Sequence, residues 1–158
     1  MNNLYNISEV KLSYRSKPTK AKRVQISCSA DCYKVLIDNW DKGELEHKES
    51  FKILLLNQNS IVLGIYTVAE GGIAGIQVDV RVILQAAILA NACSIVLAHN
   101  HPSGNISPSF EDSTTTKGVI LAANTMNIRV YDHIIVGRNK YFSFAEKGIL
   151  YKGITDKS

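Results

Sequence analysis

The chain has 158 residues, a formal net charge of +4, 46% hydrophobic residues and 20% charged residues. This composition is typical of one globular domain, because a chain of this length can bury roughly 70% of the surface that its unfolded form exposes. No stretch approaches the ~20 apolar residues of a membrane span, and the start of the chain lacks the charged and apolar regions of a secretory signal. We therefore expect a cytoplasmic protein without a membrane anchor.

The first segment, residues 1–23, is predicted to form an extended basic arm. From Arg15 to Arg23 no acid interrupts the cations, and Pro18 lies among them. The cations are Arg15, Lys17, Lys20, Lys22 and Arg23. This arm is a candidate for contact with DNA phosphates, although a strong nucleic-acid surface would interleave basic residues with aromatic ones. The domain proper is predicted to begin near Val24.

The apolar spacing after the arm predicts alternating helices and strands. The predicted helices cover residues 30–39, 79–91 and 110–124, and the predicted strands cover residues 51–56, 60–68, 94–98, 128–137 and 141–144. The first two strands surround the turn 57–59 and form a hairpin. We therefore predict one α/β domain over residues 24–152, followed by a tail over residues 153–158.

The chain has three cysteines, Cys28, Cys32 and Cys93. An odd number without a secretory signal argues against a disulfide framework. No second pair of ligands lies near Cys28 and Cys32, so they are poor candidates for structural zinc. We predict that all three are small core residues.

Two histidines lie at the end of the predicted strand 94–98. Successive strand side chains alternate between the two faces, so His99 and His101 are expected to point the same way. Asp112 follows a loop rich in Pro, Gly and Ser and lies at the start of a predicted helix, so the chain can return a carboxylate to the same point. Catalytic zinc sites typically have three protein ligands and an open fourth position, whereas structural sites are closed. The sequence therefore predicts one working zinc ion per chain.

Ser109 has two interpretations. Ser107-Pro108, followed by Ser109 and then Asp112 three residues later, is typical of a helix start, with Pro at the first helical position or with a variant capping box. In that case Ser109 has a structural role only. Alternatively, its hydroxyl stabilises the oxyanion of a tetrahedral intermediate, a contribution of about 3 kcal/mol when the donor is well placed.

The segment from His99 to Asp112 resembles the JAMM signature of MPN-domain metalloproteases, which is His-x-His, seven residues, Ser, two residues and Asp. Together with Asp-His-Ile-Ile-Val-Gly at residues 132–137, it is similar to the bacterial RadC family over about residues 24–150. The resemblance implies a mixed sheet of cytidine-deaminase-like architecture, zinc held by His99, His101 and Asp112, and Ser109 near the bound water. Longer members carry a helix-hairpin-helix region ahead of this domain, so we expect the short form here.

Hydrolysis needs a general base as well as a metal, and Glu49 and Glu70 are the candidates. In the MPN pattern the catalytic glutamate lies just ahead of a strand that enters the core, so the resemblance favours Glu49, which precedes the strand 51–56. Its alternative is a solvated residue of the charged run 44–49, and an exposed strand-end carboxylate is the simpler interpretation of Glu70. His133 is a candidate for a residue that orients one of the metal ligands without binding the metal itself, although a histidine packed on a sheet is commoner.

These patterns predict a zinc-dependent metallopeptidase or isopeptidase that acts on an amide carbonyl of a protein or peptide. Glu49 would transfer the proton of the attacking water, and the Ser109 hydroxyl would stabilise the oxyanion. The alternative is a DNA-associated repair or mobile-element accessory protein, in which the basic arm contacts phosphates and the zinc is structural. A scaffold without activity would follow if no carboxylate lay near the metal. The pattern predicts no oligomeric state.

Overall fold

The computed structural model describes residues 7–11, 13–15, 23–71 and 75–154, and helices and strands alternate along them. The helices are α1 (Ser29–Asp38), α2 (Val80–Leu89) and α3 (Phe110–Thr125), and the strands are β1 (Glu49–Leu56), β2 (Val62–Gly71), β3 (Ser94–Asn100), β4 (Arg129–Val136) and β5 (Tyr141–Ser143). Every predicted element is present, and no boundary differs by more than three residues. The predicted α/β class is confirmed.

The strands form one mixed sheet in the order β2-β1-β3-β4-β5. β1 pairs antiparallel with β2, which confirms the predicted hairpin, and it also pairs antiparallel with β3. β3 and β4 are parallel, and α3 provides the crossover connection that parallel neighbours require. The carboxyl end of β3 therefore leads through a loop directly to the start of α3.

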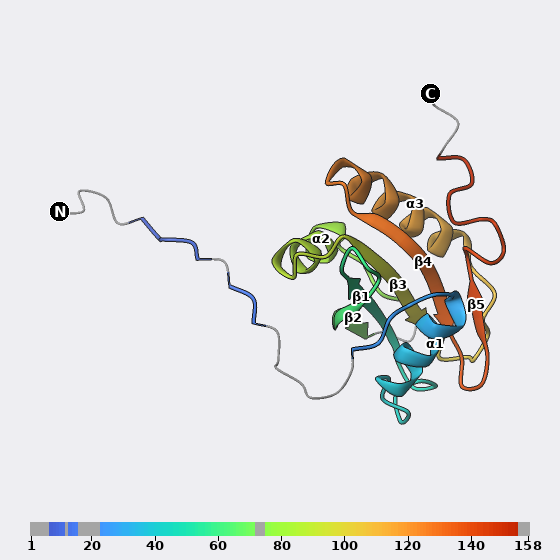
Figure 1. The fold of residues 1–158 in the computed structure, drawn as a ribbon. Coiled ribbons are helices and arrows are strands. Elements are labelled where there is room, and N and C mark those ends of the chain that lie inside the picture. Colours follow the sequence, from blue (N-terminus) through green and yellow to red (C-terminus); the bar gives the residue numbers. More distant parts are fainter. Residues whose placement is uncertain (1–6, 12, 16–22, 72–74, 155–158) are drawn as a thin grey trace, which may run out of the picture.

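Helices cover both faces of the sheet, as Figure 1 shows. α2 and α3 pack on one face, in a core that includes Ile53, Leu97 and Ile120. α1 packs on the opposite face, in a second core that includes Leu36 and Val96. All seven residues of β3 are buried, as expected for a strand covered on both faces. Alternation along β3 then directs successive side chains into different cores.

Two strands continue past their predicted carboxyl ends. β3 continues through Asn100, so His99 lies inside the strand rather than beyond its end, because β1 and β4 extend beside it and pair His99 with Phe51 and Ile135. β2 continues to Gly71, which pairs with Glu49 at the start of β1. Backbone pairing with a neighbouring strand extends both elements past the apolar runs that predicted them.

The cysteines differ from one another in burial. Cys32 is buried in the core under α1, and this burial raises the pKa of its thiol to about 12. Cys28 is exposed at the N-cap of α1, and Cys93 is half-buried. The prediction of a core position is therefore correct for Cys32 and wrong for Cys28, because Cys28 precedes the helix face that packs on the sheet. All three thiols are free.

The predicted arm lies largely outside the described residues, including Lys17, Lys20 and Lys22. Arg15 and Arg23 are described, and both are exposed. Among the described residues of this segment and its junction with the domain, Val24 and Ile26 make backbone hydrogen bonds with the fold. The Val62 N–H donates to the Val24 carbonyl at 2.9 Å, and the Ile26 N–H donates to the Ser60 carbonyl at 2.8 Å. The domain bounds 24–152 and the tail 153–158 stay predictions.

Within the described part of the chain, each helix is too short or too polar to cross a bilayer.

Candidate metal centre and its cleft

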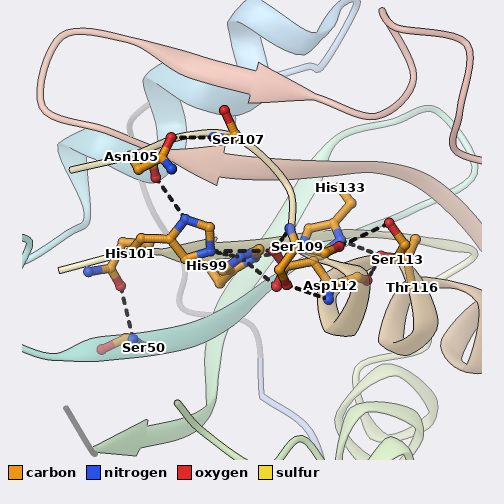
Figure 2. A network of polar contacts seen from close by, with 11 residues as sticks. Ser50, His99, His101, Asn105, Ser107, Ser109, Asp112, Ser113, Thr116 and His133 are labelled. Carbon is orange, nitrogen blue, oxygen red and sulfur yellow. Dashed lines mark hydrogen bonds and ion pairs between the residues drawn. The ribbon is translucent and has the colours of Figure 1, made fainter. Parts of the chain in front are cut away.

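Three side chains, from β3, the loop that follows it and α3, converge at the carboxyl end of β3 (Figure 2). His99 belongs to β3, His101 directly follows it, and Asp112 lies in the first turn of α3. The His99 Nε2 atom lies 3.1 Å from Asp112 Oδ1, and His101 Nε2 lies 3.4 Å from Asp112 Oδ2. The two Nε2 atoms are 3.0 Å apart. The structure therefore brings together the three ligands that the sequence predicted.

The donor atoms fit a zinc ion in type and in spacing. Two ligands that bind tetrahedral zinc at 2.0–2.1 Å lie about 3.3 Å from each other, close to the separations of 3.0, 3.1 and 3.4 Å found here. His101 Nδ1 lies 2.7 Å from the carbonyl oxygen of Asn105, which can only accept a hydrogen bond. In the neutral ring the proton is therefore on Nδ1, and the Nε2 lone pair faces the other ligands.

The site holds its carboxylate in the ionised form. Burial alone would raise the pKa of Asp112, but the adjacent imidazoles of His101 and His99 and the hydrogen bond from the Ser109 N–H hold it well below its usual range. The hydrogen bond with Asp112 raises the pKa of His101, and the burial of the ring opposes this rise. A negative charge that faces two imidazoles favours a cation between them.

Glu49 lies in the same cleft as the three candidate ligands. This cleft has a volume of about 940 Å³. Glu49 is half-buried at the start of β1, and burial raises the pKa of its carboxyl group, although His99 and His101 oppose the rise. Glu70 is absent from the cleft lining, since its carboxylate is exposed and pairs with Lys48 at 3.3 Å. Of the two candidate bases, the fold brings Glu49 to the site.

Ser109 is the N-cap of α3 and lines the cleft. Its Oγ accepts a hydrogen bond from the Asp112 N–H at 3.0 Å, and its own N–H donates to Asp112 Oδ2 at 2.7 Å. This is the predicted capping box. The alternative with Pro at the first helical position is wrong, because Pro108 precedes the N-cap and Phe110 is the first helical residue. As the Oγ accepts in the cap, its hydroxyl hydrogen is free to donate.

Asn100 was not among the predicted site residues, yet it fixes the segment that carries Glu49. The Asn100 side chain is fully buried, and its Oδ1 accepts a hydrogen bond from Ser50 N–H at 2.9 Å. Its Nδ2 donates to the carbonyls of Leu45 at 2.7 Å and Lys48 at 2.9 Å. These contacts hold the backbone on both sides of Glu49. Strand alternation could have indicated this role, because the middle residue of His-Asn-His must point into the opposite core, where a buried amide needs partners.

Replacement of Asn100 by Ala is expected to lower the free energy of unfolding by about 2 kcal/mol, because it leaves buried backbone groups of this segment without partners. Urea denaturation measures the change. Asn124→Ala is the matched control, since Asn124 is exposed on α3 and the substitution should change stability by less than about 0.5 kcal/mol. Equal effects of the two substitutions would contradict the role of Asn100.

A mixed sheet between two helical layers, with two histidines and one carboxylate open to a cleft, defines a domain of the JAB or MPN class. Residues 26–149 match the family model described as RadC-like JAB domain. The chain therefore belongs to the RadC-like JAB domain family. This confirms the family resemblance found in the sequence.

Curated relatives agree with this membership. A UPF0758 protein of Salinibacter ruber is 38% identical over 138 residues, which cover 85% of this chain and 57% of the relative. A UPF0758 protein of Flavobacterium johnsoniae is 39% identical over 107 residues, which cover 68% of this chain and 46% of the relative. The UPF0758 protein YeeS of Escherichia coli is 44% identical over 104 residues, or 65% of this chain and 70% of the relative. The chain thus spans about half the length of the first two, and these names state no reaction.

Proposed function

We propose that the protein is a zinc-dependent hydrolase that cleaves amide bonds, as a metallopeptidase or isopeptidase. One observation carries the proposal: the three candidate ligands open onto a cleft that also holds the half-buried carboxylate of Glu49. A structural zinc ion is normally enclosed by four protein ligands. Among the described residues, the candidate cluster contains only His99, His101 and Asp112, which favours a working metal over a structural one.

A zinc ion bound by three protein ligands would lower the pKa of its bound water to ~7 and would act as a Lewis acid on the substrate carbonyl. Glu49 accepts a proton from the attacking water and then delivers it to the leaving amine. The Ser109 hydroxyl donates a hydrogen bond to the oxygen that becomes negative. Asn100 keeps Glu49 at the cleft through its contacts on both sides of that residue.

The cleft is large enough to admit a segment of a peptide substrate. Its volume of about 940 Å³ lies near the upper end of the range for small-molecule pockets, roughly 300–1,000 Å³. Residues 75–78 line part of it without belonging to a helix or strand. This open space beside the candidate ligands can accept an extended chain.

Peptide cleavage with a zinc-loaded sample tests the proposal. The full-length protein is incubated with a peptide library that includes lysine-linked isopeptides, and new termini are identified by mass spectrometry. We expect products that disappear after chelation of the metal and in the His99→Ala/His101→Ala double variant. Identical product profiles for the wild type and the double variant would overturn the assignment.

A second proposed function is DNA association through the basic arm, for which the exposure of Arg15 and Arg23 is the structural support. If the arm binds phosphates, deletion of residues 1–23 lowers DNA affinity. The deletion also flattens the dependence of log K on log salt, by roughly 0.9 for each phosphate that the arm neutralises. Fluorescence anisotropy at several salt concentrations measures both quantities, with unchanged zinc content as the control. An unchanged affinity and slope would show that the arm is a solvated tail.

A further inference from the structure

A buried chain of hydrogen bonds adjoins the candidate metal site (Figure 2). His133, on β4, is fully buried, and its Nε2 lies 2.8 Å from His99 Nδ1. The His133 Nδ1 atom lies 2.6 Å from Thr116 Oγ1, on α3. Thr116 Oγ1 in turn lies 2.6 Å from the backbone carbonyl oxygen of Asp112. These hydrogen bonds therefore join two of the three candidate ligands, His99 and Asp112, through His133 and Thr116.

The chemistry of the partners sets the direction of each hydrogen bond. The carbonyl of Asp112 can only accept, so the single hydroxyl hydrogen of Thr116 points to it. Thr116 Oγ1 then accepts from His133 Nδ1–H. The His133 ring is fully buried and its two nitrogens face the Thr116 hydroxyl and the His99 imidazole rather than a carboxylate, so the ring is neutral and its Nε2 carries no hydrogen. His133 Nε2 therefore accepts from His99 Nδ1–H, and the lone pair of His99 is on Nε2.

We propose that His133 and Thr116 are positioning residues, which fix His99 in the Nδ1–H tautomer and direct its Nε2 lone pair to the metal position. If the hydrogen bonds ran in the opposite direction, with Thr116 donating to His133, a hydrogen would lie on His99 Nε2 and that atom could not bind the metal. A hydrogen bond to the second nitrogen of a ligating histidine commonly sets its tautomer and orientation. This role depends on the metal site of the proposed function, but it does not require hydrolysis.

Packing against aromatic neighbours holds the imidazole rings of His99 and His133 in place. The His133 ring stacks on Phe144 with centroids 4.7 Å apart, and the His99 ring is parallel to that of Phe51 at 6.1 Å. The backbone of His133 is also fixed, since its N–H donates to the buried carboxylate of Asp132 at 2.7 Å. Rotation of either imidazole is therefore opposed by its neighbours, so the tautomer is set by the hydrogen bonds of Thr116 and not by ring flips.

The test compares Thr116→Val, which removes the hydroxyl but keeps a similar shape, with Thr116→Ser, which keeps the hydroxyl. Zinc affinity is measured on the full-length protein by competition with a chromophoric chelator. We expect Thr116→Val to weaken zinc binding by roughly 10- to 100-fold, the range seen for such outer partners, and Thr116→Ser to restore most of it. Equal weakening in both variants, or a change of less than about threefold in Thr116→Val, would overturn the proposal.

A spectroscopic readout separates positioning from packing. In metal-free protein with ¹⁵N-labelled histidine, we expect the two-bond ¹H–¹⁵N spectrum to show neutral His133 with its hydrogen on Nδ1, in both the wild type and Thr116→Ser. Thr116→Val should populate the Nε2–H form. A wild-type His133 with its hydrogen on Nε2 would contradict the proposed direction. Full zinc affinity without any peptide cleavage would instead contradict the hydrolase proposal alone.

Discussion

Replacement of Glu49 by Gln is expected to lower the turnover of an amide substrate by roughly 10²-fold or more. Gln keeps the size and polarity of the side chain but cannot take a proton from water. The three candidate ligands remain, so zinc content should equal that of the wild type. Steady-state kinetics on a peptide identified by the library screen, together with metal analysis of the same samples, measures both quantities.

Glu70→Gln is the matched control for this prediction. Glu70 lies on the neighbouring strand, but its carboxylate is exposed and paired with Lys48, so the substitution should leave turnover nearly unchanged. Loss of turnover in Glu70→Gln with normal activity in Glu49→Gln would show that the base is at the other position. Activity that survives both substitutions would exclude either glutamate as an essential base.

The second large effect concerns the metal. Purified protein should carry about one zinc ion per chain, and the His99→Ala/His101→Ala double variant should carry almost none, because removal of two of three ligands leaves a single carboxylate. Inductively coupled plasma mass spectrometry measures the occupancy. His47→Ala is the control, since His47 is exposed and lies outside the cleft lining.

Asp112 needs its own pair of variants, because its side chain also takes part in the capping box of α3 with Ser109. Asp112→Ala removes the ligand and the capping-box hydrogen bond from the Ser109 N–H, while the backbone N–H of residue 112 still donates to Ser109 Oγ, and loss of one such bond costs about 1 kcal/mol. Asp112→Asn keeps an oxygen that can accept from the Ser109 N–H but removes the charge that faces the two histidines. Zinc affinity should therefore fall in both variants, while thermal stability should fall mainly in Asp112→Ala. Full zinc content in the double histidine variant would contradict the site as a whole.

The candidate ligands could be predicted from sequence because their geometry is local. Strand alternation places His99 and His101 on one face, and the helix start at Ser109 returns Asp112 to them after a short loop. Both roles considered for Ser109 also depend on residues close to it in the sequence. Its position as the N-cap leaves its hydroxyl hydrogen able to form a hydrogen bond in the cleft. A catalytic role for Ser109 stays a prediction.

The supporting residues could not be predicted in the same way because their contacts depend on the register between strands. Asn100 meets Ser50 only because β3 lies beside β1, and His133 reaches His99 only because β3 and β4 run parallel in the observed register. Thr116 joins them because α3 packs against β4. A periodic pattern in one segment carries no information about such registers, so His133 could be predicted only as a candidate, without its partners.

A crystal structure of the zinc-loaded protein, with anomalous scattering at the zinc edge, tests the central claim most directly. We predict a single zinc ion between His99, His101 and Asp112, with no fourth protein ligand and with the Glu49 carboxylate facing the open side. A fourth protein side chain that closes the coordination, or a zinc ion bound elsewhere with these three residues unliganded, would contradict an open catalytic site.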